Sequence, residues 1–89
     1  MESDLNDWIR STRIGFLLTE LETGATFAKV GLDSNDEGKR TRNRKNARKA
    51  YNAILRFVPD TTLTQTEKQQ IDEGLVCLRS LLRRLGETF

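Results

Sequence analysis

The 89-residue sequence contains no histidine, one cysteine and one proline, and its aromatic residues are one tryptophan, one tyrosine and four phenylalanines. Histidine is the usual general base near neutral pH and the commonest metal ligand, so its absence excludes most designs of active site and metal site. There is no glycine-rich phosphate loop, and Asp33, Asp36 and Glu37 lack the spacing of a calcium-binding loop. The sequence therefore predicts a protein that is not an enzyme and has no cofactor and no metal site.

The cysteine content and the hydrophobic runs bear on the location of the protein. Cys77 alone cannot form a disulfide within the chain, and small domains without disulfides are typical of reducing compartments. The first residues are acidic where a secretory signal would be basic, and the longest nearly apolar run, residues 14–18, is far too short to cross a bilayer. We therefore expect a cytoplasmic protein without a membrane segment. Cys77 falls away from the apolar stripe of its helix, and we interpret it as a partly exposed small filler residue, with redox or intermolecular disulfide chemistry as the alternative.

Two segments with turn-forming residues, 33–38 and 58–62, divide the chain into three blocks. In each block apolar residues recur at spacings of three and four, which places them on one stripe of a helix. The stripes are Ile14, Leu18, Leu21, Ala25, Ala28 and Leu32; Ala47, Tyr51, Ile54 and Val58; and Ile71, Leu75, Leu78, Leu82 and Leu85. Three matching stripes favour a helical bundle with a single core.

Local sequence chemistry supports the ends of these helices. The residues from Thr64 to Glu67 have the form of a capping box, and those from Ser34 to Glu37 offer the same form before the second block. Gly86 suits a left-handed residue after the third helix. The sequence therefore predicts one all-α domain over residues 1–89, an up-down-up three-helix bundle with helices at about 4–32, 36–58 and 65–86.

The short connections also predict which residues face each other. Facing residue numbers should add up to about 70 between the first two helices and to about 122 between the second and third, because consecutive helices run antiparallel. In this register Gly24 and Gly74 lie among other small residues and let the backbones approach. Leu5, Trp8 and Ile9 are expected beyond the second turn, where they would cover Phe57.

The first helix carries apolar residues on two sides. At ~100° per residue, five of them lie opposite the core stripe. They are Leu5, Ile9, Phe16, Phe27 and Val30. A continuous helix would leave these residues for a partner, whereas a break at Gly15 or Gly24 would turn them inward. We favour the continuous helix, which predicts a protein–protein interaction or self-association module, such as a homodimer, that uses this side.

Basic residues gather between residues 39 and 56, a segment without a single acidic residue. In the predicted register this segment meets the arginines of the third helix, so one end of the bundle is positive. Contacts with an anion or a nucleic acid would come from Arg40, Arg42, Arg44, Lys45, Arg48, Arg79 and Arg83. A solvated helix face explains the segment better than nucleic-acid binding does, because no nucleic-acid motif and no interleaved aromatic residues accompany it. An acidic protein partner explains it as well as a nucleic acid does. Nucleic-acid binding is therefore the second hypothesis, after protein interaction.

The segment from Asn43 to Tyr51, which reads N-R-K-N-A-R-K-A-Y, resembles short bacterial proteins of unknown function that share an N-R-x-N-A-R-x-A-Y segment. The resemblance extends from about Gly24 to Glu87. It implies a bacterial protein and carries no activity with it. It draws attention to Asn43, Asn46, Arg48 and Tyr51 as a set, and we expect the asparagines to bond within the protein and the tyrosine to pack.

Overall fold

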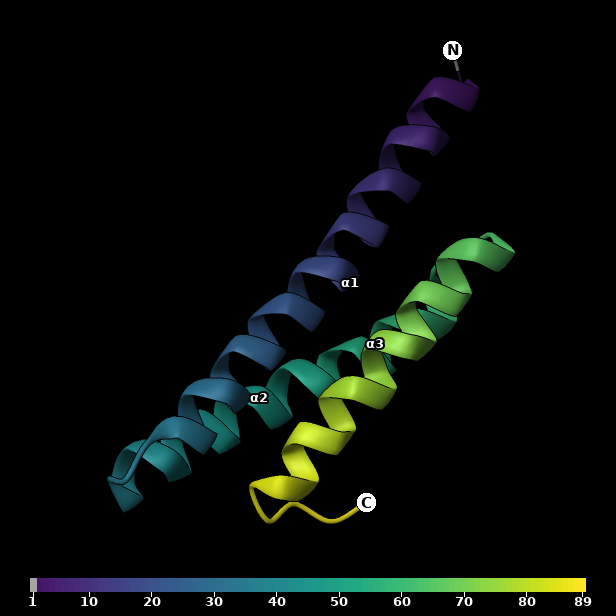
Figure 1. Ribbon diagram of the computed structural model, residues 1–89. Coiled ribbons are helices and arrows are strands. Elements are labelled where there is room, and N and C mark those ends of the chain that lie inside the picture. The colour runs from purple at the N-terminus through teal and green to yellow at the C-terminus, as the bar shows by residue number, and fades with distance from the viewer. Residues whose placement is uncertain (1) are drawn as a thin grey trace.

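The computed structural model describes residues 2–89, with side chains from Asp4 onward. It contains the helices α1 (Glu2–Asp33), α2 (Glu37–Phe57) and α3 (Gln65–Arg84), and a short 3-10 helix, η1 (Val58–Asp60), that follows α2. The three long helices run up, down and up (Figure 1), which confirms the predicted all-α three-helix bundle. Every predicted helix end lies within two residues of the observed one. No helix in the described part of the chain is both long enough and apolar enough to span a membrane.

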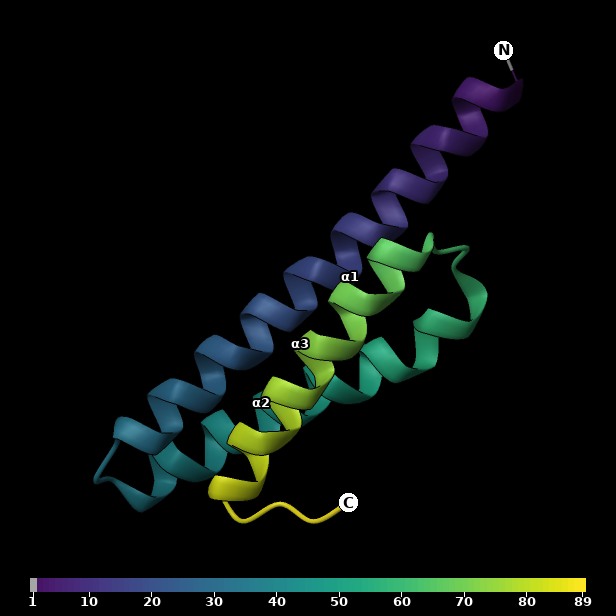
Figure 2. The same ribbon diagram turned by 45° about the vertical axis from the view of Figure 1, so that its right-hand side comes forward.

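Helix α1 is continuous and much longer than its two companions. Its 32 residues extend about 48 Å, whereas the 21 residues of α2 and the 20 of α3 extend about 30 Å each. The first turns of α1 consequently project beyond the other helices, as both Figure 1 and Figure 2 show, and the molecule is a rod of 53 × 19 × 17 Å. We call residues 2–9 the overhang, because they precede Arg10, which bonds to α3.

The buried side of α1 differs from the predicted stripe. Leu17 is fully buried, whereas the predicted stripe members Leu18, Ala25 and Leu32 are only partly buried. The buried positions of α1 are Ile14, Leu17, Leu21, Gly24, Ala28 and Gly31, which centre about 50° away from the predicted direction at ~100° per residue. The core side of α1 is therefore rotated toward its glycines.

The glycines cause this rotation because a position without a side chain lets the neighbouring helices come close to the backbone of α1. A Cβ atom on Gly24 would lie 2.9 Å from Cδ2 of Leu78 and 3.1 Å from Cβ of Ala50, so α2 and α3 both touch α1 there. A Cβ on Gly31 would meet Leu85 at 3.2 Å. Close approach at these two positions, seven residues apart, brings this side of α1 to the centre of the bundle.

The registers between helices are partly as predicted. Between α1 and α2, the pair Gly24 and Ala50 has numbers that add up to 74, close to the expected 70. Between α2 and α3, Arg79 bonds to Tyr51, which gives 130 rather than 122, so the predicted register was wrong by about two turns. The reason is that residues 58–64 continue past the end of α2 before α3 begins, which shifts α3 toward the N-terminal end of α1 (Figure 2).

The helix caps follow the sequence with one exception. The capping box of Thr64 and Glu67 and the left-handed Gly86, with φ 101°, are confirmed. At the start of α2 the cap is Asp36, not Ser34 as predicted. The Asp36 carboxylate accepts a hydrogen bond from the Lys39 backbone N–H at 3.0 Å. The backbone N–H groups of Lys39 and Gly38 hold the pKa of Asp36 below its ordinary value.

Two glycine substitutions test the role of the close approach. We expect Gly24→Ala to destabilise the protein by up to about 2 kcal/mol, since strain of about 1–3 kcal/mol from overpacking is set against a gain of about 1 kcal/mol in helix propensity. Gly15→Ala is the matched control, because its Cβ would have no atom within 4 Å, and it should stabilise by about 0.5–1 kcal/mol. Urea unfolding of the three proteins measures both effects. Equal stabilisation by the two substitutions would contradict the assigned packing.

Candidate interaction surfaces

The overhang exposes large apolar side chains in water. Leu5 is 58% exposed and Trp8 is 64% exposed, while Ile9 is partly buried. With Phe16, 44% exposed, they follow one side of α1 at helical spacing, and we call these four residues the α1 stripe. Contiguous apolar surface of this kind on a projecting element is typical of a binding surface.

The α1 stripe leads into a shallow groove at the end of the bundle. The Phe16 ring meets the Phe57 ring edge-on, with centroids 5.6 Å apart, and Phe57 is itself 43% exposed. Around this pair lies a groove of about 500 Å³ lined by Thr12, Arg13, Phe16, Phe57, Asp60 and Thr61. The prediction that Leu5 and Trp8 cover Phe57 was wrong, because α1 stays straight and carries both past the end of α2. Ile9 is partly buried and lies beside Thr61 and Thr62 in the second turn.

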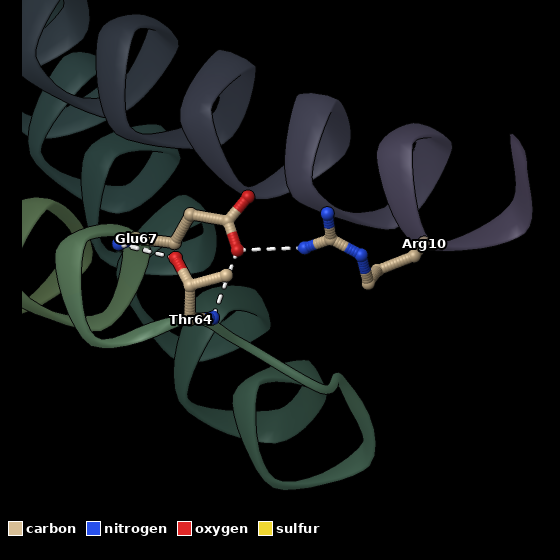
Figure 3. Close-up of polar contacts among 3 residues, drawn as sticks. All are labelled: Arg10, Thr64 and Glu67. Atoms are coloured by element: carbon tan, nitrogen blue, oxygen red, sulfur yellow. Dashed lines mark hydrogen bonds and ion pairs between the residues drawn. The ribbon is translucent and has the colours of Figure 1, made fainter. Parts of the chain in front are cut away.

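A polar contact fixes α1 to the start of α3 directly beside the overhang (Figure 3). Nη1 of Arg10 donates to Oε1 of Glu67 at 2.7 Å, and the same oxygen accepts from the Thr64 backbone N–H at 2.9 Å. The Thr64 hydroxyl in turn accepts from the Glu67 backbone N–H. The Thr64 backbone N–H, with help from the Thr64 hydroxyl and Arg10, holds the pKa of Glu67 below its ordinary value. This carboxylate therefore serves both as a helix cap and as an anchor for α1.

The five residues predicted to form the partner surface do not share one patch. Leu5, Ile9 and Phe16 follow the same side of α1 within its first half. Phe27 is partly buried and packs against the core, because the rotated core side leaves it on the flank of α1 rather than opposite the core. Val30 is 40% exposed, but it lies fourteen residues from Phe16, or about 21 Å along the helix.

Trp8 and Phe57 were missing from the predicted surface, although the structure places them in it. Trp8 was assigned to the core end because the predicted register brought it to the second turn. Its angular position at ~100° per residue, about 60° from Leu5 on the outer side of α1, was a usable indication of the α1 stripe.

A second surface lies on the seam between α2 and α3, where three arginines surround two aromatic rings. Phe89 meets Tyr51 edge-on at 5.1 Å, and the Cζ atom of Arg48 lies 4.3 Å from the centroid of the Phe89 ring. The Cζ atoms of Arg79 and Arg83 each lie 5.6 Å from the same centroid. We call Arg48, Arg79, Arg83 and Phe89 the arginine cluster.

Of the other predicted basic residues, Arg44 lies beside this cluster, whereas Arg40 and Arg42 lie near the start of α2. Arg40 donates to the Gly31 carbonyl at 3.3 Å and so joins α1 to α2, and Arg42 lies next to Gly38 and Asp36 at the start of α2. Lys45 is exposed, and Arg44 reaches the neighbourhood of Gly86. The observed register explains the change, because it places Arg48 rather than Arg40 opposite Arg83.

A third, smaller surface lies on α3. Val76 is 64% exposed and Cys77 is exposed beside it, and both line a shallow depression with Asp72 and Glu73. No group of three potential metal-ligating side chains occurs among the described residues. Val76 therefore offers an exposed apolar side chain on a different helix, with which the side chains of the overhang can be compared.

The anchor of α1 makes stability depend on pH. Because its folded-state pKa is lowered, charged Glu67 stabilises the fold above its ordinary pKa of 4.5, and this contribution is lost as the pH falls through the folded-state pKa. We expect Glu67→Gln to lower the melting temperature at neutral pH and to have a smaller effect near pH ~3. Thermal unfolding followed by circular dichroism checks this, with Glu22→Gln, which changes an exposed carboxylate, as the control. A pH-independent difference for Glu67→Gln would contradict the assigned role of the charge.

Comparisons of the chain with known protein families, with curated proteins and with solved structures found no match. The resemblance of residues 43–51 to short bacterial proteins stays a prediction. Any functional assignment therefore rests on the overhang, the groove and the arginine cluster themselves.

Proposed function

We propose that this protein is a non-catalytic self-association module in which two copies pair through their overhangs. The observation that carries this proposal is the projection of Leu5 and Trp8 from the bundle, more than half exposed, beside an apolar groove that the chain itself does not fill. Water contact with these side chains is unfavourable, since burying each large apolar side chain is worth about 1.5–3 kcal/mol.

A second copy is the occupant that fits the groove best. If two α1 helices pair antiparallel at the overhang, Trp8 of each copy lies level with the turn of the other that carries Thr12 and Phe16. The contact is then reciprocal, as twofold symmetry requires, and each groove is filled by the same segment that the other copy offers.

The charges of α1 favour this antiparallel arrangement. The overhang carries Asp4 and Asp7, whereas the next turns carry Arg10 and Arg13. In the register that sets Trp8 against Thr12, antiparallel pairing brings Asp7 of one copy level with Arg13 of the other, whereas parallel pairing would place like charges side by side. Complementary charges of this kind select orientation more than they raise affinity.

The size of the contact predicts a weak dimer. Covering the exposed parts of Leu5, Trp8, Phe16 and Phe57 removes roughly 400 Å² per copy, since a buried aromatic side chain covers about 150–250 Å². A standard interface buries about 800 Å² per partner, so this contact belongs to the small, transient class. We therefore expect association in the micromolar range or weaker, with monomers at low concentration.

Sedimentation velocity from low micromolar to millimolar concentration tests the proposal. The natural protein should shift from monomer to dimer, and Trp8→Glu should remain monomeric because it places a charge in the contact. Val76→Glu is the matched control, since Val76 is equally exposed, 64%, on a different helix, and it should dimerise normally. Trp8 is the single tryptophan, so its fluorescence emission should shift to shorter wavelength on association.

Two results would overturn the proposal. One is a strict monomer at millimolar concentration, which would leave the groove for another protein. The other is a dimer that Trp8→Glu does not weaken, which would place the association elsewhere on the rod.

A further inference from the structure

Among the described residues, no carboxylate forms an ion pair with an arginine of the arginine cluster. The one ion pair among side chains described from Asp4 to Phe89 joins Arg10 and Glu67, at the opposite end of the bundle. Like charges gathered around one ring repel each other, and the repulsion is larger near a protein surface than in bulk water. The rings of Tyr51 and Phe89 offset part of this cost through cation–π contacts. An anion bound among the three guanidinium groups would neutralise the repulsion that remains between them.

Two of the three arginines are held in fixed positions. The buried Tyr51 hydroxyl accepts from Nε of Arg79 at 3.0 Å and from Nη2 at 2.8 Å. Arg48 donates from Nε to the Asn52 side chain at 3.2 Å and from Nη1 to the Thr88 carbonyl at 3.1 Å. These bonds reduce the entropy that the side chains would lose on meeting a ligand, which favours binding.

Donor groups remain free at the same place. Nη1 of Arg79 and Nη2 of Arg48 have no acceptor among the described residues, and neither does any nitrogen of Arg83, whose side chain is exposed. Guanidinium groups match the oxygens of a phosphate in pairs, more closely than lysine does. The free donors of this cluster are therefore suited to phosphate oxygens.

The aromatic ring at the centre narrows the class of ligand. Phe89 is 48% exposed, and its ring lies among the arginines rather than apart from them. Surfaces that bind single-stranded nucleic acid combine arginines for the backbone with an aromatic ring on which a base stacks. An acidic peptide would use the arginines but has no general need for the ring.

We propose that the arginine cluster binds single-stranded nucleic acid, with Arg48, Arg79 and Arg83 contacting phosphates and Phe89 contacting a base. The cluster lies on the α2–α3 seam near the C-terminal end of the described chain, whereas the overhang lies at the N-terminal end (Figure 1). This binding is therefore independent of self-association, and the Trp8→Glu monomer should retain it.

Fluorescence anisotropy tests the proposal with a labelled oligothymidylate of about 20 nucleotides, longer than the ~4–16 nucleotides that one small domain covers. Affinity should fall with salt, with a slope in log–log form of about −0.7 per phosphate contact. Arg83→Gln should weaken binding roughly three- to tenfold at low salt and reduce the magnitude of the slope by about 0.7. Phe89→Leu should weaken binding and leave the slope unchanged.

Arg56→Gln is the matched control, because it removes the same charge from an exposed position in the last turn of α2, away from the cluster. It should bind as the natural protein does, and circular dichroism should show all variants equally folded. Inorganic phosphate and polyglutamate serve as competitors, and both should compete poorly. Three results would overturn the proposal: no salt-sensitive binding, equal losses for Arg83→Gln and Arg56→Gln, or competition by polyglutamate as strong as by unlabelled oligothymidylate. The last result would identify an acidic protein segment as the ligand.

Discussion

The close approach of α1 to both neighbouring helices at Gly24 is the contact on which the rest of the structure depends. Leu78 of α3 and Ala50 of α2 both reach the position that a side chain on Gly24 would occupy. Because this contact sets the rotation of α1, it decides which of its apolar residues are buried. Leu17 faces the core, Phe27 lies on the flank, and Phe16 remains half exposed beside Phe57. The surface chemistry of the rod is thus a consequence of how its backbones pack.

The unequal lengths and the offset of the helices create the two surfaces. Since α1 is eleven residues longer than α2, its first turns have no companion and carry Leu5 and Trp8 into solvent. Since α3 is displaced toward that same end, Arg79 and Arg83 come level with Tyr51 and Arg48 rather than with the start of α2. An exposed apolar surface therefore forms at one end of the rod, and a cluster of arginines forms on the α2–α3 seam, without any loop built for the purpose.

The sequence predicted the helices well because their ends carry local chemistry, such as the capping box at Thr64 and the glycine at residue 86. It did not predict the rotation of α1, because a search for apolar residues does not count glycine as a core residue. In the structure Gly24 is buried, whereas its neighbour Ala25 is only partly buried. The path of residues 58–64 depends on tertiary contacts, so the α2–α3 register was wrong. The position of Phe89 was missed for the same reason, because only the folded seam brings Arg48 and Arg83 around it.

The first turns of α1 pack against no other helix of the described chain, and this also affects their backbone. Short helical segments in water are marginal, and most helical stability in proteins comes from tertiary packing. The amide hydrogens before Arg10 should therefore exchange with deuterium far faster than those between Leu17 and Ala28, although both belong to one helix. The single long helix of this protein thus joins a slowly opening middle to a rapidly fraying tip.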